Sequence, residues 1–234
     1  TKNDKPDSGY ENNLMQTGIT TTFEQYKDLY LTSSLSVTHD DLTVDDTASS
    51  SMKKQAGTFT DLAFDYGVRV DKRDKAYMPT SGYISSFSQT VPFYADSPYL
   101  RNKFTLSKYN SFGENIIGSF KVFAAAINGL SNEDVRISKR ARVPSSRLRG
   151  FVPGRVGPVD NKDWVGGNYA ASINFETNLP KLLPESSKTD VGLFLDIGNV
   201  WGVDYDDSID ESNKLRSSVG INTSWLSPVG PMSF

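Results

Sequence analysis

The sequence predicts an all-β fold and, within that class, a transmembrane antiparallel β-barrel. Two observations support this prediction. Apolar and polar side chains alternate with a period of two along most of the chain, while helical periodicity is scarce. The alternating runs are long, and short links between them alternate with long ones, as in barrels with tight periplasmic turns and long outer loops. A soluble β-sandwich is the competing fold, although its strands are usually only about five or six residues long.

About ten alternating runs are long enough to form strands. In the clearest run, residues 62–70, Leu62 and Phe64 begin an apolar face, and Asp65 and Arg69 lie on the opposite face. The predicted strands cover residues 14–26, 28–38, 58–71, 82–93, 101–112, 115–128, 167–179, 190–200, 215–226 and 230–234.

The predicted links fall into two main classes. Short links lie near residues 26–28, 112–114 and 227–230, and long polar links lie at 39–57, 129–166 and 201–214. The links at 72–81 and 180–189 are intermediate, and 94–100 is a short outer loop. The longest link, 129–166, is the most distinctive segment of the chain.

The composition permits a barrel without requiring one. No run approaches the roughly 18 apolar residues of a membrane-spanning helix, and the mean hydropathy is -0.44. A barrel strand needs only about 9–11 residues and exposes every second side chain to lipid, so its average hydropathy resembles that of a soluble protein. The net charge of -3 argues against a nucleic-acid-binding protein, which usually carries a basic patch. There are no cysteines, which excludes disulfides and thiol chemistry.

No catalytic, metal or cofactor site is predicted. His39 is the only histidine, and the chain contains no G-x-S-x-G nucleophile motif, so a Ser–His–Asp triad is not expected. The acidic run of Asp204, Asp206, Asp207, Asp210 and Glu211 has Ile209 and Leu215 where a calcium loop needs glycine and an acidic residue. We expect this run to form a solvated outer loop.

Five motifs follow one another between residues 74 and 231. The long link contains Arg149-Gly150-Phe151 followed by Gly157-Pro158. The other four are Asp74 with residues 77–82, residues 165–168, residues 196–201, and residues 217–221 leading into 225–231. In this order the motifs resemble the superfamily that contains BamA, TamA and the two-partner secretion transporters. Each motif alone is weak evidence for this resemblance, whereas all five in this order are specific for it. Residues 1–57 resemble the superfamily mainly in their pattern of strands.

This resemblance implies a barrel of sixteen strands, of which residues 1–234 would supply about the sixth to the fifteenth. The chain would then be a partial barrel domain of a longer protein, without periplasmic POTRA domains. The implied function is to fold and insert other β-barrel proteins into the outer membrane of a Gram-negative bacterium, without ATP or another cofactor. Client strands would pair at a seam between the first and last strands, both outside the expected ten. The implied partners are client outer-membrane proteins, outer-membrane lipids, and accessory lipoproteins that bind the periplasmic domains.

Three other functions compete with this one. A translocation-assembly or two-partner secretion transporter shares the barrel and the loop motif, and the number of POTRA domains would distinguish it. A passive porin would leave its lumen open, which a conductance measurement would detect. A soluble β-sandwich that binds a ligand would fractionate without detergent.

The resemblance further implies that the long loop folds into the lumen, where its arginine meets carboxylates of the barrel wall. Glu176 and Asp196 each lie on the polar face of an alternating run, so both would face the lumen. A turn centred on Ser186 would place them directly opposite each other, and a guanidinium between them would relieve their repulsion. Arg149 is the candidate, with Arg147 and Arg155 as alternatives. Gly150, Phe151, Gly157 and Pro158 complete the expected structural motif.

The loop also carries a basic cluster, for which lipopolysaccharide or nucleic acid is one possible partner. Charge balance against lumen carboxylates is the simpler interpretation, at least for Arg149. The cluster comprises Arg136, Lys139, Arg140, Arg142, Arg147 and Arg149.

Overall fold

A computed structural model describes residues 1–113, 115–180, 182–184, 187, 189–209, 214–227 and 230–233. Sequence predictions that concern Glu114, Ser186, Asp210, Glu211, Pro228, Val229 and Phe234 lie outside these residues. Among the described residues, no helix is both long enough and apolar enough to cross a membrane.

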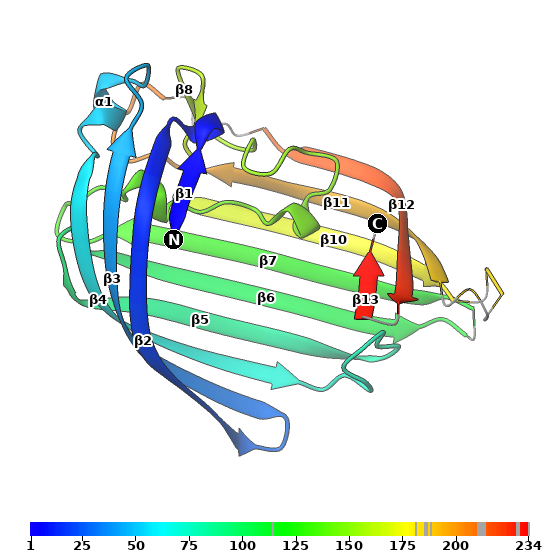
Figure 1. Cartoon of the computed structure of the whole chain (residues 1–234). Coiled ribbons are helices and arrows are strands. Elements are labelled where there is room, and N and C mark those ends of the chain that lie inside the picture. The colour runs from blue at the N-terminus through cyan, green and yellow to red at the C-terminus, as the bar shows by residue number, and fades with distance from the viewer. Residues whose placement is uncertain are drawn as a thin grey trace.

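The described chain forms one curved, antiparallel sheet of eleven strands (Figure 1). Strands that follow one another in sequence are neighbours, except that β7 pairs with β10 across the long loop. The strands are β1 (Lys2–Lys5), β2 (Tyr10–Tyr26), β3 (Leu29–Val44), β4 (Gly57–Asp71), β5 (Gly82–Ala95), β6 (Tyr99–Ser111), β7 (Ile117–Gly129), β10 (Tyr169–Leu179), β11 (Thr189–Trp201), β12 (Arg216–Ser227) and β13 (Gly230–Ser233).

All ten predicted strands have counterparts in this sheet, and the all-β prediction is confirmed. The predicted link at 39–57 was wrong at its start, because β3 continues to Val44. The last part of β3 is polar on both faces: Asp40 points inward, where the side chains of Asn12 and Ser138 bind it, whereas His39 and Asp41 are exposed on the outer face. A strand segment that is polar on both faces has no apolar–polar alternation and looks like a loop in sequence, which explains the error.

Four short elements were not predicted. These are β1, which pairs with β2; the helix α1 (Ser50–Lys53); and the two-residue strands β8 (Val159–Asp160) and β9 (Asp163–Trp164), which form a small hairpin inside the long loop. The loop also holds short 3-10 turns at η2 (Ile137–Lys139) and η3 (Ser145–Arg147), while η1 (Pro6–Ser8) joins β1 to β2. Elements of two to four residues lack the periodic pattern on which the strand predictions depend.

The two faces of the sheet differ in an unusual way. The inner face carries buried polar side chains, such as Asn174 and Asp196, which are 1% and 0% exposed. The outer face carries exposed apolar ones, such as Phe175 at 47% and Val219 at 79%. In water this distribution would be unfavourable, whereas a barrel in lipid requires it.

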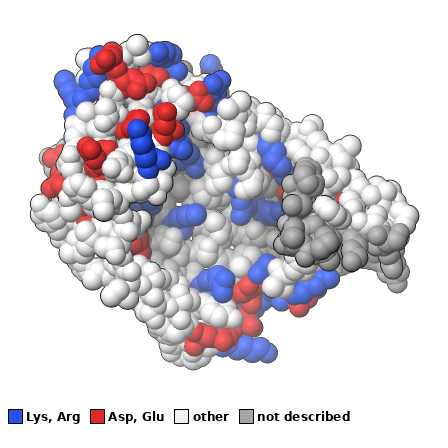
Figure 2. Space-filling model, in the orientation of Figure 1, with Lys and Arg blue, Asp and Glu red and all other residues white. Residues whose placement is uncertain are grey.

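The long loop between β7 and β10 lies along the inner face, in front of these strands in Figure 1. Its apolar residues pack against strand residues in a buried cluster, so the loop has a core of its own. The cluster contains Val135, Ala141, Val143, Leu148 and Val156 from the loop, and Tyr99, Phe123, Ile127, Ala170 and Val200 from the strands. Figure 2 shows the hollow on this side of the sheet, with Lys and Arg side chains along its walls.

Candidate functional site

Arg149 lies just after η3 and reaches the inner face of β11. Its backbone N–H donates to Asp196 Oδ2 at 3.0 Å, and its Nε donates to the same oxygen at 2.8 Å. Its Nη2 donates to Asp196 Oδ1 at 2.7 Å and lies 2.7 Å from Glu176 Oε1. The planar guanidinium therefore binds one carboxylate in bidentate fashion while it contacts a second. We call Arg149, Glu176 and Asp196 the arginine clamp.

The predicted register of the two carboxylates was wrong. Asn174, not Glu176, pairs with Asp196, and Glu176 pairs with Phe194. The difference is two residues, so both carboxylates still share the inner face, as diagonal rather than direct neighbours. Sequence symmetry about a presumed turn centre was the only basis for the predicted register, and that centre lies outside the described residues.

Asn174 completes the polar bonds around Asp196. Its Nδ2 donates to Asp196 Oδ1 at 2.8 Å and to the carbonyl oxygen of Arg147 at 2.7 Å. The Asn174 side-chain amide therefore binds both Asp196 on β11 and the backbone of the long loop. Of the three candidate arginines, only Arg149 forms ion pairs with the two carboxylates among the described residues, since Arg155 pairs with Asp7 at an exposed site.

Two contacts of the clamp were not anticipated. Lys121 of β7 pairs with Glu176, so that two cations and two carboxylates balance one another. The Arg149 guanidinium also lies 3.8 Å from the centre of the Phe194 ring, a cation–π contact. Alternation within residues 117–129 could have identified Lys121 as lumen-facing, but nothing in the sequence fixes how β7 aligns with β10.

The remaining residues of the loop motif shape the backbone next to the clamp. Gly150 has φ +81°, a left-handed conformation that strongly favours glycine. Phe151 packs against the buried cluster of the loop. Gly157 has φ +113°, and a Cβ there would lie 2.8 Å from Val200 Cβ. Pro158 beside it is fully buried.

A second ion-pair site holds the start of the loop to β4, on the same inner face but several strands away from β10 and β11. Arg136 Nη2 donates to both oxygens of Asp61 on β4, at 2.8 and 2.6 Å, and both side chains are at most 4% exposed. Lys139 Nζ lies 3.2 Å from the same carboxylate. The Arg136 guanidinium covers the Phe59 ring at 4.3 Å. We call Arg136, Lys139 and Asp61 the second anchor; the sequence provided the arginine but not its partner.

Arg140 occupies a third ion pair, with Asp204 in the link between β11 and β12. Asn168 donates to the same carboxylate at 2.8 Å, and the backbone N–H of Val135 does so at 3.0 Å. Burial would raise the pKa of Asp204, but Arg140 and these two donors outweigh it and hold the pKa below its ordinary value. The prediction of a purely solvated acidic loop was therefore wrong for Asp204, which is bound within the protein.

Asp74 explains the motif in the link between β4 and β5. Its Oδ1 accepts hydrogen bonds from the backbone N–H of Thr80 at 2.9 Å and of Ser81 at 3.1 Å, and its Oδ2 accepts from the Thr80 hydroxyl at 2.7 Å. Gly82 has φ +88°, and a Cβ there would lie 2.0 Å from the carbonyl oxygen of Lys72. The motif therefore holds a tight turn.

The ring of His39 lies beside a hydroxyl group. Its Nδ1 lies 3.2 Å from Thr60 Oγ1 in the next strand. Within the described part of the chain, no group of three or more His, Cys, Asp or Glu side chains is arranged to hold a metal ion.

Comparison with known proteins agrees with this fold. The Omp85 superfamily domain matches residues 1–234. The outer membrane protein assembly factor BamA of Neorickettsia risticii is 31% identical over 192 residues, which cover 80% of this chain and 26% of that protein. BamA of Neisseria meningitidis is 32% identical over 114 residues, covering 37% and 14%. The chain thus spans about a quarter or less of these two relatives.

A eukaryotic relative and a solved structure extend the comparison. A SAM50-like protein of Schizosaccharomyces pombe is 28% identical over 144 residues, which cover 58% of this chain and 30% of that protein. The crystal structure of Haemophilus ducreyi BamA lacking POTRA domains 1–3 superposes with a TM-score of 0.83 at 21% identity, covering 96% of this chain and 50% of that one. The structural match confirms the barrel fold. With its whole length matched by the superfamily domain, the chain belongs to the Omp85 superfamily.

Proposed function

We propose that this chain is part of a factor that folds and inserts β-barrel proteins into the outer membrane of a Gram-negative bacterium. Two bacterial relatives are named outer membrane protein assembly factor BamA. The proposed clients are unfolded outer-membrane proteins, and the proposed surroundings are outer-membrane lipids. Accessory lipoproteins would bind periplasmic domains of the whole protein, in which residues 1–234 would supply about the sixth to the fifteenth barrel strand.

The distribution of side chains over the two faces supports the location in a membrane. Exposed large apolar residues gather on the outer face, while Asp40, Asp61 and Asp196 are buried on the inner one. A bilayer would cover the first set and a polar lumen would accommodate the second. The long loop and the links with α1 and Asp204 would then lie on the extracellular side.

The arginine clamp is the observation that carries the proposal. It holds the loop against β10 and β11, while the second anchor holds it against β4. A loop fastened to both sides of a curved sheet resists changes in that curvature. We propose that this gives the barrel wall a defined shape during client insertion, and that the clamp is structural and performs no catalysis.

A translocation-assembly or two-partner secretion transporter is the second candidate, because membership of the superfamily does not separate these functions. Counting the POTRA domains of the whole protein tests it, with five favouring the assembly factor. A passive porin is opposed by the loop, whose buried cluster and ion pairs occupy the inner side of the sheet.

The proposal is tested with the full-length protein in liposomes, by following the folding of a urea-unfolded outer-membrane protein. Arg149→Ala leaves two inward carboxylates with Lys121 as their remaining cation. We expect the rate of client folding to fall and the free energy of unfolding of the barrel to drop by about 3 kcal/mol, as when one partner of a buried ion pair is removed.

Arg155→Ala is the matched control, since Arg155 lies in the same loop and its pair with Asp7 is exposed on both sides. We expect both its activity and its heat-modifiable gel mobility to equal those of the wild type. Equal client folding by wild type and Arg149→Ala would contradict the role of the clamp. No acceleration of client folding by the wild-type protein would contradict the assembly function itself.

A further inference from the structure

The outer face of β6, β7, β10 and β11 holds a groove, and Glu176 of the arginine clamp is among the residues that line it. Two adjacent cross-strand rows form it. Lys108, Phe120, Phe175 and Leu195 stand opposite one another in the first row. Asn110, Gly118, Thr177 and Leu193 do so in the second. Because directly paired residues share a face, all eight lie on the outer side of the sheet.

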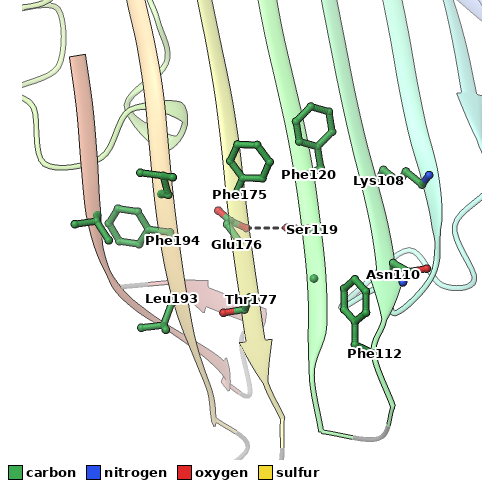
Figure 3. Close-up of a pocket in the computed structure, with 13 residues that line it drawn as sticks. Lys108, Asn110, Phe112, Ser119, Phe120, Phe175, Glu176, Thr177, Leu193 and Phe194 are labelled. Atoms are coloured by element: carbon green, nitrogen blue, oxygen red, sulfur yellow. Dashed lines mark hydrogen bonds between the residues drawn. The ribbon is translucent and has the colours of Figure 1, made fainter. Parts of the chain in front are cut away.

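The two middle residues of the second row, Gly118 and Thr177, have no side chain or a small one, and this creates the hollow. Phe120 and Phe175 stand beside them with ring centres 5.3 Å apart. Phe112 packs over Gly118, since a Cβ there would lie 2.7 Å from its ring. The groove has a volume of about 750 Å³. Figure 3 shows Phe120 and Phe175 side by side, with Phe112 and Leu193 on other sides of the same floor.

One rim of this apolar groove is polar. Lys108 and Asn110 lie together on β6 (Figure 3), both exposed. Among the ion pairs of the described residues none includes Lys108, and its direct cross-strand neighbours are the aromatic Phe120 and Tyr83. A lysine on a lipid-facing strand destabilises a barrel unless its ammonium reaches the interface or an anion. The rim lies near the end of β6, where a lysine side chain can reach toward the headgroups.

We propose that this groove binds one glycerophospholipid molecule. An acyl chain would fill the hollow over Gly118 and Thr177, and the phosphate would accept an ion pair from Lys108 and a hydrogen bond from the Asn110 amide. The inference rests on the proposed function in that the outer face must lie in a bilayer. Charge complementarity selects the ligand class, because a cation beside an aromatic slot matches a phosphate attached to a hydrocarbon chain.

The test uses the full-length protein, delipidated in detergent and then offered one lipid at a time. The lipids are phosphatidylglycerol, phosphatidylethanolamine, lipid A and phosphate-free diacylglycerol, and native mass spectrometry counts the molecules that stay bound. We expect the wild type to retain one phospholipid, not to retain diacylglycerol, and to keep its lipid in the presence of inorganic phosphate. Preferential retention of lipid A would overturn the glycerophospholipid assignment.

Variants separate the headgroup contact from the slot. We expect Lys108→Gln to weaken phospholipid binding about tenfold, as loss of one charged hydrogen bond does. Gly118→Leu fills the hollow and should abolish retention of all phospholipids. Should Gly118→Leu fail to fold, Thr177→Leu fills the same floor from the paired strand. Lys103→Gln is the control, because Lys103 lies on the same strand but pairs with Ala125 of the inner side.

Equal retention by the wild type, Lys108→Gln and both slot variants would overturn the inference. Client folding is measured on the same samples. A wild type that enters liposomes and folds clients but retains no phospholipid disproves this site alone. A wild type that does not enter liposomes disproves the proposed function as well.

Discussion

At the scale of single residues, Gly157 meets two separate requirements. Its φ of +113° favours glycine, and its Cα packs so closely on β11 that a Cβ would lie 2.8 Å from Val200 Cβ and 3.1 Å from the Val200 carbonyl oxygen. Gly113, in the link between β6 and β7, has φ +84°, but a Cβ there would meet nothing within 4 Å. The two glycines therefore differ in packing while they share the backbone requirement.

We predict that Gly157→Ala lowers the free energy of unfolding more than Gly113→Ala does. Both substitutions place a side chain in the left-handed region, at a cost of about 1–2 kcal/mol. Only Gly157→Ala also forces the loop away from Val200, with a further cost of about 1–3 kcal/mol. Urea unfolding of the two full-length variants in lipid vesicles measures the difference. Identical losses would show that the approach to Val200 has no energetic weight.

Asp74 gives a prediction about pH. Hydrogen bonds from the Thr80 hydroxyl and the Ser81 backbone N–H lower its pKa from 3.8 to about 2. The charged form is thus favoured in the folded state, so its contribution to stability is complete above pH 3.8 and is lost as the pH falls toward 2. We predict that the wild type loses stability more steeply than Asp74→Asn over this range. Parallel stability curves for the two proteins would contradict the prediction.

The residues of the arginine clamp show what sequence reasoning can reach. Arg149 stands out through its motif, and Asp196 and Glu176 through alternation along their strands. Lys121, Asn174 and Asp61 could not be assigned as partners, because such contacts depend on how neighbouring strands align and how the loop crosses them. That alignment follows from turn geometry, on which alternation gives no information.

At the scale of elements, two ion-pair sites hold the long loop to strands of the sheet, in addition to its pairs with Asp204 and Asp7. The arginine clamp holds it to β10 and β11, and the second anchor holds it to β4. Apolar packing between these places adds to both. Either ion-pair site can therefore keep much of the loop in position when the other is removed.

We predict that Arg136→Gln and Arg149→Gln each increase tryptic cleavage within the loop only modestly, and that the double variant is cleaved far faster than the two effects combined would suggest. The sites share one loop, so their energies are not additive. The target bonds follow Arg140, Arg142 and Arg147, which are at least partly buried in the docked loop. Cleavage of the double variant at the rate expected from independent effects would contradict this coupling.

Long strands were predictable as elements, and short ones were not. Alternation over ten or more residues identified β2 to β7 and β10 to β12, because each has one apolar and one polar face. The helix α1 is only four residues long, although Ser49, whose hydroxyl accepts from the backbone N–H of Met52 at 3.1 Å, is a recognisable cap. The strand β1 is polar throughout and forms only through its pairing with β2.

At the scale of the whole molecule, the exposed apolar outer face yields a test of the environment. Ile173 lies in the middle of β10 and is 40% exposed, while Leu215 precedes β12 and is 72% exposed. In a soluble sheet, a lysine would be tolerated at either position. In a bilayer, a lysine in the middle of a lipid-facing strand costs about 2–4 kcal/mol.

We therefore predict that Ile173→Lys strongly reduces stability in lipid vesicles, whereas Leu215→Lys has little effect. Urea unfolding of the full-length protein, followed by tryptophan fluorescence, provides the measurement. If both lysines are tolerated equally, the outer face of β10 does not lie against hydrocarbon.

The two fastenings of the loop also determine an order of events. Arg149 and Asp196 are 47 residues apart in sequence, and Arg136 and Asp61 are 75 apart. Each pair can form only after the strand that carries its carboxylate has joined the sheet, and such distant contacts are slow to form. We therefore expect the long loop to dock after the strands that carry Asp61 and Asp196 have paired with their neighbours. Until the loop docks, the guanidinium groups of Arg136 and Arg149 remain hydrated. We therefore expect their dehydration to occur in the last phase of folding.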